Sequence, residues 1–175
     1  MAREPLRELR ARTGRTASLG VLWGTEVAYI DRWQGSRQGQ YAVDEGIGVG
    51  TRRPIHCTAA GKALLARLPV AEQRELIAKL RLARSTPKTI VTKTALRAEL
   101  EGIAAEGGVA VEDEECLAGR LAIAAVVVDA EGRSIAAVEL AVPAEVYSRK
   151  ELPAGLGPMV IAAARDIGLD QTGVT

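Results

Sequence analysis

The stretch Pro54-Ile55-His56-Cys57-Thr58-Ala59-Ala60-Gly61-Lys62-Ala63-Leu64-Leu65-Ala66 carries the strongest fold signal in the chain. Its leucines fall on one helical face together with Leu68, and Thr58 is a residue type favoured at a helix N-cap. The pattern therefore predicts a helix that begins near Ala59, and Pro69 predicts that a second helix opens immediately afterwards.

The start of this helix is also a candidate anion-binding site. The first N–H groups of a helix have no intrahelical partner and carry partial positive charge, which suits a carboxylate or a phosphate. The small side chains of Ala59, Ala60 and Gly61 would let an anion approach the backbone. A tight helix–sheet crossing would need the same small residues, so both interpretations stay open.

Patterns on either side of this stretch predict a mixed α and β domain. In chain order they predict a surface helix over residues 3–13 that ends at Gly14, a hairpin over 16–33, and a glycine-rich loop over 34–53 that can include extended pieces. After these they predict helices over 69–80 and from Thr94 to Gly107, strands over 109–142, and a closing helix over 155–167.

The strands over 120–128 and 133–142 are separated by a short turn with a glycine and should pair antiparallel. Alternation gives one large apolar face, which we expect in the core: Leu121, Ile123, Ala125 and Val127 with Ala136, Val138, Leu140 and Val142. The other face is mostly alanine and valine but carries Arg120 and Glu139. Such a face either packs closely against backbone or leaves room for a ligand, and its two charges could instead form an exposed ion pair.

Composition limits the possible classes. The 175 residues suffice for one domain, and 47% hydrophobic and 26% charged residues are ordinary globular values. No apolar run is long enough for a membrane helix, and no secretory signal is visible, so we expect a cytoplasmic protein without a membrane partner. With one histidine and two cysteines, neither a structural zinc site nor a disulfide framework is expected, and no metal or cofactor is predicted.

Charge argues against nucleic-acid binding by this chain alone. Five arginines and two glutamates give residues 1–15 a net charge of +3, which leaves −2 for the other 160 residues. A domain that neutralises phosphates usually concentrates its cations on one face, and here the only concentration is a short N-terminal segment.

Two further motifs need an interpretation. Cys57 beside His56 near a helix start raises the possibility of a thiol enzyme, but neighbours in an extended segment point in opposite directions, so they would not readily form a dyad. We interpret Cys116 as a small buried filler. The acidic run over 112–115 lacks a Ca²⁺-loop pattern, so we interpret it as a solvated turn.

The stretch over residues 54–66 also carries a family resemblance. Together with Thr89-Ile90, Leu96, Glu99-Leu100, Ile103, Gly107, Glu114-Glu115, Gly119 and Ile123-Ala124-Ala125 before Asp129, it resembles the effector-binding domain of IclR-type transcriptional regulators, over roughly residues 16–168. The resemblance implies an α+β fold of the GAF-like or profilin-like kind, with a central antiparallel sheet flanked by helices. It also implies a small-molecule pocket between one sheet face and the helix that begins near Ala59.

The resemblance implies a division of the chain as well. Residues 1–15 correspond to the end of a linker helix, residues 16–170 to the effector-binding domain, and we expect residues 171–175 to be a disordered tail. Family members carry a winged helix-turn-helix before the linker, so we expect DNA binding only through such a separate domain. A homodimer or tetramer is also implied, and Leu6 and Leu9 could supply a helix–helix seam.

Pocket positions transfer from the family by motif. The backbone N–H groups of Ala59 and Ala60 match positions that hold an effector carboxylate, and the other candidate positions are Thr58, Gly61, Arg53, Glu112, Arg120, Ala122, Glu139 and Ala141. Family members that bind small keto acids have Cys or Ser at the positions of Ala122, Glu139 and Ala141, and apolar residues at those of Arg53 and Arg120.

These departures change the expected ligand. An unpaired Glu139 would repel a carboxylate unless Arg120 or Arg53 neutralises it, or unless the ligand offers hydroxyl or amine donors. Alanines would enlarge the cavity, so we expect a carboxylic acid larger than pyruvate or glyoxylate, aromatic or hydroxylated. We expect a sensor without catalytic residues, and the alternatives are a GAF-like sensor or interaction module unconnected to DNA and a thiol enzyme using Cys57.

Overall fold

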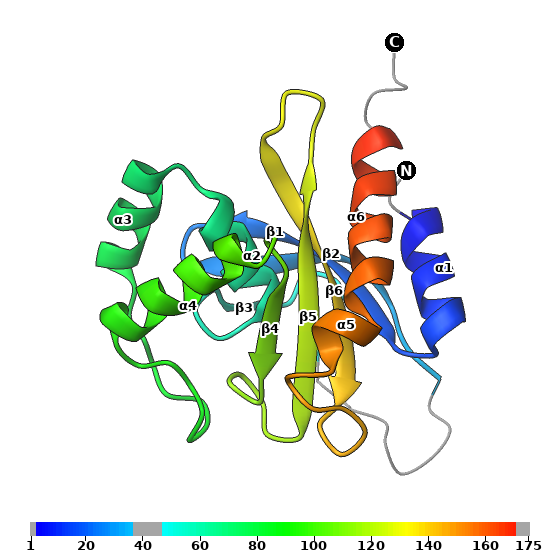
Figure 1. The fold of residues 1–175 in the computed structure, drawn as a ribbon, viewed down its shortest axis with the longest axis horizontal. Helices are drawn as coiled ribbons and strands as arrows, with labels where there is room; N and C mark the ends of the chain where they lie inside the picture. The colour runs from blue at the N-terminus through cyan, green and yellow to red at the C-terminus, as the bar shows by residue number, and fades with distance from the viewer. Residues whose placement is uncertain (1–2, 37–46, 171–175) are drawn as a thin grey trace.

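The computed structural model describes residues 3–36 and 47–170. Its strands are β1 (Thr16–Trp23), β2 (Glu26–Trp33), β3 (Arg52–Pro54), β4 (Ala110–Asp113), β5 (Arg120–Val128) and β6 (Ser134–Pro143). Its helices are α1 (Arg3–Thr13), α2 (Ala59–Arg67), α3 (Val70–Lys79), α4 (Lys93–Ala105), α5 (Leu152–Gly155) and α6 (Gly157–Asp170). The strands form one antiparallel sheet in the order β3-β2-β1-β6-β5-β4 (Figure 1).

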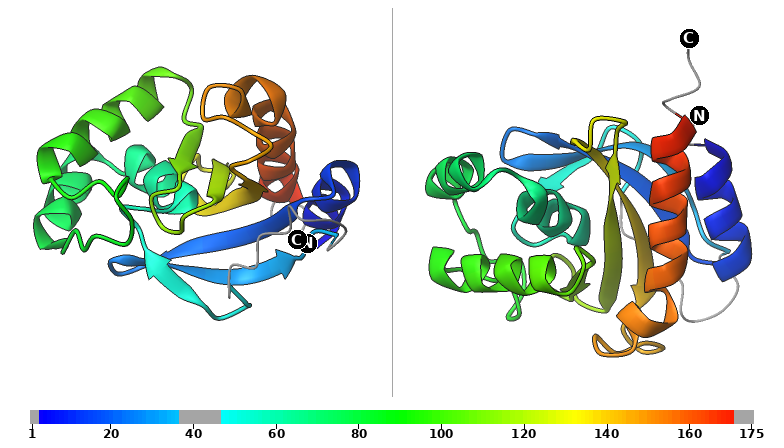
Figure 2. Two further views of the ribbon diagram at one scale, coloured as in Figure 1. Left: turned by 90° about the horizontal axis from the view of Figure 1, so that it is seen from below. Right: turned by 45° about the horizontal axis from the view of Figure 1, so that its top comes forward.

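Helices cover both faces of this sheet. The two ends of the chain, α1 and α6, lie side by side with α5 on one face, while α2, α3 and α4 lie on the other (Figures 1 and 2). Each face has its own cluster of buried apolar side chains. The predicted α+β architecture, an antiparallel sheet flanked by helices, is confirmed.

The alternation along β5 and β6 separates these two cores as the sequence predicts. Leu121, Ile123 and Val127 of β5 pack beneath α6, as do Val138 and Leu140 of β6. The alanine-rich side of both strands faces α2 instead. The sheet therefore presents its bulky face to the terminal helices and its sparse, charge-bearing face to the helix that follows Thr58.

The seam expected from Leu6 and Leu9 is internal to the chain. Both side chains are buried in the core beneath α1 and α6, so they are not available to a second copy. The physical reason is that the bulky sheet face needs an apolar cover along its whole width, and α6 alone does not provide it. Residues 1–15, which the resemblance assigns to a linker, thus include a helix that packs on the domain.

Local signals account for the N-cap of α2 and misplace that of α4. The side chain of Thr58 accepts a hydrogen bond from the Gly61 N–H, as an N-cap should. The cap of α4, however, is Thr92 and not Thr94, because Thr92 has the extended backbone that a cap needs and accepts from the Ala95 N–H. Of the loop predicted over 34–53, residues 37–46 lie outside the described residues, and Arg52 and Arg53 are an extended piece that begins the short edge strand β3.

No helix in the described ranges has both the length and the apolar composition to cross a bilayer.

Gly107 and Gly108 end α4 with positive φ angles, and the Gly108 N–H donates to the Ile103 carbonyl. The tail expected over residues 171–175 lies outside the described residues.

Candidate functional site

The first turn of α2 is held close to both the preceding segment and the sheet. The Thr58 hydroxyl donates to the Pro54 carbonyl at 3.2 Å while it caps the helix. A Cβ at position 61 would lie only 2.2 Å from the Ile55 carbonyl oxygen, so glycine is required there for the chain to fold back this tightly. The small residues at the start of α2 thus have a packing role, as the second of the two open interpretations stated.

The N–H of Ala60, in that first turn, binds a carboxylate, and the carboxylate belongs to Glu139. The distance from the Ala60 nitrogen to Glu139 Oε2 is 2.9 Å. The Tyr29 hydroxyl donates to the other oxygen, Oε1, at 2.9 Å, and Arg120 Nη2 donates to the same oxygen at 2.5 Å. All four residues are buried, so the carboxylate is enclosed by an amide, a phenol and a guanidinium.

Arg120 links this carboxylate to a second one. Its Nη1 contacts Glu112 Oε2, and the other oxygen of Glu112 accepts from the Cys116 N–H at 3.1 Å. Burial raises the pKa of Glu112 to about 8, against the opposing effect of Arg120. Burial also raises the pKa of Tyr29 well above its ordinary value. At pH 7 the cluster therefore holds Arg120 as a cation between two carboxyl groups, beside a neutral Tyr29.

On the side of β5 and β6 that faces α2, the neighbours of Arg120 and Glu139 are mostly alanines. Ala122 and Ala141 are directly opposite each other across β5 and β6, and Ala124 is opposite Glu139. Ala122 and Ala124 belong to the same buried cluster as the alanines of α2, and Ala141 is buried as well. Because these alanines are small, α2 can approach the sheet closely even though the side chains of Arg120 and Glu139 lie between the helix and the sheet.

The structure brings the sequence-predicted site residues together. The following are buried around the start of α2 and the facing strands: Thr58, Ala59, Ala60, Gly61, Glu112, Arg120, Ala122, Glu139 and Ala141. Arg53 is half-buried on β3, and its charge acts on Cys116, so it too lies near the cluster. The exposed ion pair considered for Arg120 and Glu139 is instead a fully buried one.

The two cysteines lie at the edge of this cluster. The Cys57 thiol is buried, and its hydrogen bond to Cys116, together with burial, raises its pKa. The same hydrogen bond lowers the pKa of Cys116 to about 7, with help from Arg120 and Arg53. Cys116 is partly exposed, so it is not the buried filler we expected. A buried thiol with a raised pKa is a poor nucleophile, which counts against Cys57 as the centre of a thiol enzyme.

His56 does not make up for the raised pKa of the Cys57 thiol. Its Nε2 lies 3.1 Å from the Ala83 carbonyl oxygen, and burial lowers its pKa. Within the described part of the chain, no group of three or more histidine, cysteine, aspartate or glutamate side chains could hold a metal ion.

The acidic run over 112–115 is not the solvated turn we expected. Glu112 and Glu115 are buried, and each is paired with a cation. The partner of Glu115 is Lys62, whose Nζ lies 2.6 Å from Glu115 Oε1. Carboxylates tolerate burial when they are paired in this way. Lys62 lies 53 positions from Glu115, and Arg120 lies on a different strand from Glu112, so local sequence did not reveal either pairing.

Sequence reasoning missed Tyr29 and Lys62. Tyr29 lies two residues after Val27 on the inward side of β2, and a buried tyrosine usually needs a partner for its hydroxyl, which was a usable signal. Lys62 sits among apolar residues of α2 and is itself fully buried. A lysine within such a stretch was a sign of a buried ion pair.

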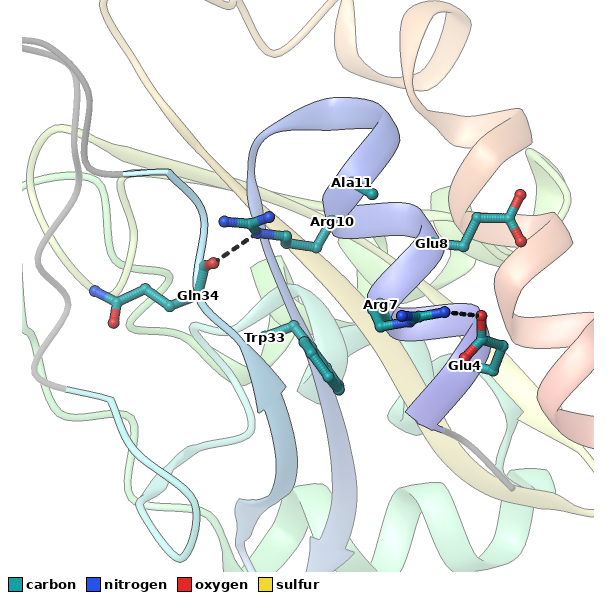
Figure 3. A pocket seen from close by; sticks show the side chains of 7 residues that line it. All are labelled: Glu4, Arg7, Glu8, Arg10, Ala11, Trp33 and Gln34. Carbon is teal, nitrogen blue, oxygen red and sulfur yellow. Dashed lines mark hydrogen bonds and ion pairs between the residues drawn. The ribbon is translucent and has the colours of Figure 1, made fainter.

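A separate surface pocket lies on the other side of the sheet, between α1 and the end of β2. It has a volume of about 690 Å³ and is lined by Glu4, Arg7, Glu8, Arg10, Ala11, Trp33 and Gln34 (Figure 3). Arg10 Nε donates to the Gln34 carbonyl at 3.0 Å across it. None of the sequence-predicted site residues lines this pocket.

Comparison with known proteins identifies the family. Residues 1–169 match the family model described as the bacterial transcriptional regulator IclR C-terminal domain. The chain is 36% identical over 138 residues to the probable transcriptional regulator SauR of Cupriavidus necator, which covers 79% of this chain and 53% of the relative. The chain spans about half the length of the curated relatives it matches.

Solved structures agree with this match. A putative transcriptional regulator from Rhodococcus sp. RHA1 has a TM-score of 0.89 at 34% identity, covering 97% of this chain and 66% of that one. A double mutant of the PobR inducer binding domain from Acinetobacter, in complex with 3-hydroxybenzoic acid, has a TM-score of 0.82 at 30% identity, covering 95% and 94%. The chain therefore belongs to the IclR family of bacterial transcriptional regulators and corresponds to their C-terminal, effector-binding domain.

Proposed function

We propose that this domain senses a small carboxylic acid, aromatic or hydroxylated, and that it controls DNA binding by a separate winged helix-turn-helix domain of a cytoplasmic regulator. The acid would bind between the start of α2 and the facing side of β5 and β6. The candidate residues are those listed above around Ala60, Arg120 and Glu139. The regulator would act as a homodimer or tetramer.

One observation carries this proposal: the Ala60 N–H, the Tyr29 hydroxyl and the Arg120 guanidinium converge on a buried carboxylate. Buried charges are stable only when hydrogen-bonded and paired, and these three donors provide both. In this structure the carboxylate is that of Glu139, but the donor set is chemically suited to any carboxylate of the same shape.

The ligand class has independent support. The PobR inducer binding domain, at 30% identity and with almost complete mutual coverage, is solved with 3-hydroxybenzoic acid. That ligand is an aromatic, hydroxylated carboxylic acid, the class that the departures at Ala122, Glu139 and Ala141 favour over a small keto acid.

Regulation requires only that the acid bind one conformation of the regulator more tightly than the other. Helix α2 lies against β5 and β6 and also contacts β1; the opposite side of β5 and β6 packs against α6, and β1 packs against α1. A shift of α2 relative to the sheet can therefore be transmitted through β1 to α1, the helix that the family resemblance assigns to the linker.

The test is a thermal-shift screen of the chain with aromatic and aliphatic carboxylic acids, each paired with its neutral amide, for example 3-hydroxybenzoate with 3-hydroxybenzamide. A bound acid should stabilise the domain by about 2.7 kcal/mol at one hundred times its Kd. The proposal predicts stabilisation by one group of acids and not by their amides. Equal effects of acids and amides, or no effect of any acid, would contradict it.

A further inference from the structure

We propose that Glu139 is an internal ligand of the effector site, so that an effector carboxylate must displace the Glu139 carboxylate in order to bind. Glu139 then determines which acids the domain accepts. This inference rests on the proposed function, because it assumes that the donors around Ala60 are the donors an effector would use.

The first argument is geometric. Both oxygens of Glu139 are engaged, Oε2 by the Ala60 N–H and Oε1 by Tyr29 and Arg120. A backbone N–H has one hydrogen and cannot donate at full strength to two carboxylates. An incoming acid that uses the Ala60 N–H therefore has to take the place of Glu139.

The second argument concerns charge. Arg120 already contacts two carboxyl groups, those of Glu112 and Glu139. A third carboxyl group in this buried cluster would be repelled by Glu139, since like charges interact strongly where water is excluded. Displacement lowers this cost, because Glu139 turns away from the three donors as the effector carboxylate takes its place.

The third argument concerns the surroundings of Glu139. Its neighbours in register on the adjoining strands are Ser18 and Ala124, and residue 141 on its own strand is alanine. These small side chains place few atoms around the Cβ atom of Glu139. Rotation of the Glu139 side chain away from the Ala60 N–H would meet the least bulk over Ser18, Ala124 and Ala141.

Displacement has a consequence for specificity. An acid that offers only a carboxylate replaces the contacts of Glu139 without adding any, and it also loses translational freedom on binding. An acid with a ring or hydroxyl groups gains further contacts that can outweigh this loss. The native domain should therefore discriminate against acetate-sized acids and accept larger ones.

The test removes the internal carboxylate and supplies an external one. We compare the unsubstituted chain with Glu139→Ala and Glu139→Ser in acetate and propionate, with sodium chloride at equal ionic strength, by thermal shift and calorimetry. Because a competing form reduces the apparent affinity by its population, both variants should bind acetate at least about tenfold more tightly than the unsubstituted chain. Chloride should not stabilise them, and Glu145→Ala, at an exposed position, should bind acetate as the unsubstituted chain does.

A variant that does not leave a cavity guards against misfolding. Glu139→Gln keeps the shape of the side chain but loses the charge, and its readout is the Ala60 amide proton in a ¹⁵N–¹H spectrum. Loss of a charge-assisted hydrogen bond should move this proton upfield by more than any amide on the α1 side of the sheet. An unmoved Ala60 proton would overturn the inference, as would equal acetate affinity in the unsubstituted chain and the two cavity variants.

The two proposals fail differently. If no acid stabilises the unsubstituted chain but acetate binds to the Glu139→Ala variant, the internal ligand stands and the proposed effector class is wrong. If acids bind equally well with and without Glu139, the internal ligand is wrong and the proposed effector class stands.

Discussion

Replacement of Lys62 by methionine is a strong test of how the site is built. Lys62 is fully buried in α2, and its Nζ donates to Glu115 Oε1 at 2.6 Å, to the Val111 carbonyl at 2.7 Å and to Glu99 Oε1 at 2.9 Å. These bonds attach the helix that carries Ala60 to β4 and to the loop after it. Methionine has a similar length and no charge, so the substitution removes the ion pair with little change of volume.

The magnitude follows from what is left behind. Glu115 is 2% exposed and would keep a hydrogen bond of 3.4 Å from the Asp113 N–H and a long contact of 3.8 Å to Arg149, while Glu99 keeps Arg149 at 2.9 Å. Removal of one partner of a buried ion pair costs about 3–5 kcal/mol. At roughly 2–4 °C per kcal/mol for a domain of this size, the melting temperature should fall by about 6–20 °C.

Urea unfolding and calorimetry at pH 7.5 provide the assay, with Lys79→Met as the matched control. Lys79 also lies 2.6 Å from a glutamate, Glu75, but the side chains are 63% and 69% exposed. Such a pair contributes about 0.3–0.5 kcal/mol, so the control should lose almost nothing. A Lys62→Met loss below about 1 kcal/mol would refute the reasoning.

The pH dependence gives a second check. Burial raises the pKa of Glu115 even with Lys62 present, and without that cation the folded-state pKa should rise further above the unfolded value. A raised folded-state pKa means that the folded protein takes up the proton first, so stability increases as the pH falls toward the unfolded value. The deficit of the variant should therefore shrink on acidification from pH 8 to pH 5, and a deficit that grows would contradict this account.

Three further predictions concern the same region. Gly61→Ala should destabilise the domain by about 1–3 kcal/mol in urea unfolding, because the new Cβ would clash with Ile55. Its control is Gly102→Ala, where nothing lies within 4 Å of the new Cβ, and this variant should stabilise α4 by about 0.5–1 kcal/mol. Equal effects of the two substitutions would show that the close approach at Gly61 is not required. Thr58→Ala should cost about 1 kcal/mol in the same assay through loss of the N-cap, and no loss would contradict the capping role. Because the folded-state pKa of Glu112 is about 8, protonation of this group stabilises the fold below that pH, and the benefit declines as the pH rises from about 4.5 to 8 by up to about 1.4 kcal/mol per pH unit. Unfolding measured across this range should show a shallower decline in Glu112→Gln, and an unchanged slope would assign the pH dependence to other groups.

The fold could be predicted from the sequence wherever a local pattern determines it. Alternation along β5 and β6 assigned Leu121 and Leu140 to one face and Arg120 and Glu139 to the other, and the two cores follow that division. The N-cap at Thr58 was equally local. The cap of α4 was misplaced by two residues because Thr92 and Thr94 are both acceptable residue types, and only backbone conformation distinguishes them.

The site was predicted less completely because its contacts are distant in sequence. Glu139 reaches the Ala60 N–H across 79 positions and the Tyr29 hydroxyl across 110. The sequence indicated an anion site at the Ala60 N–H and a charged residue, Glu139, on the facing strand. It did not indicate that the Glu139 carboxylate binds this N–H. The burial of Glu115 was missed for the same reason, since its cation lies 53 positions away.

The central claim is that a carboxylate effector binds at the start of α2 in place of Glu139. The most direct measurement is a ¹⁵N and ¹³C NMR titration of the labelled chain with the acid that gives the largest thermal shift. The account predicts that the Ala60 amide and the Glu139 carboxyl carbon shift together along one binding curve. Shifts confined to the α1 pocket around Arg10 and Trp33, with Ala60 and Glu139 unmoved, would contradict it.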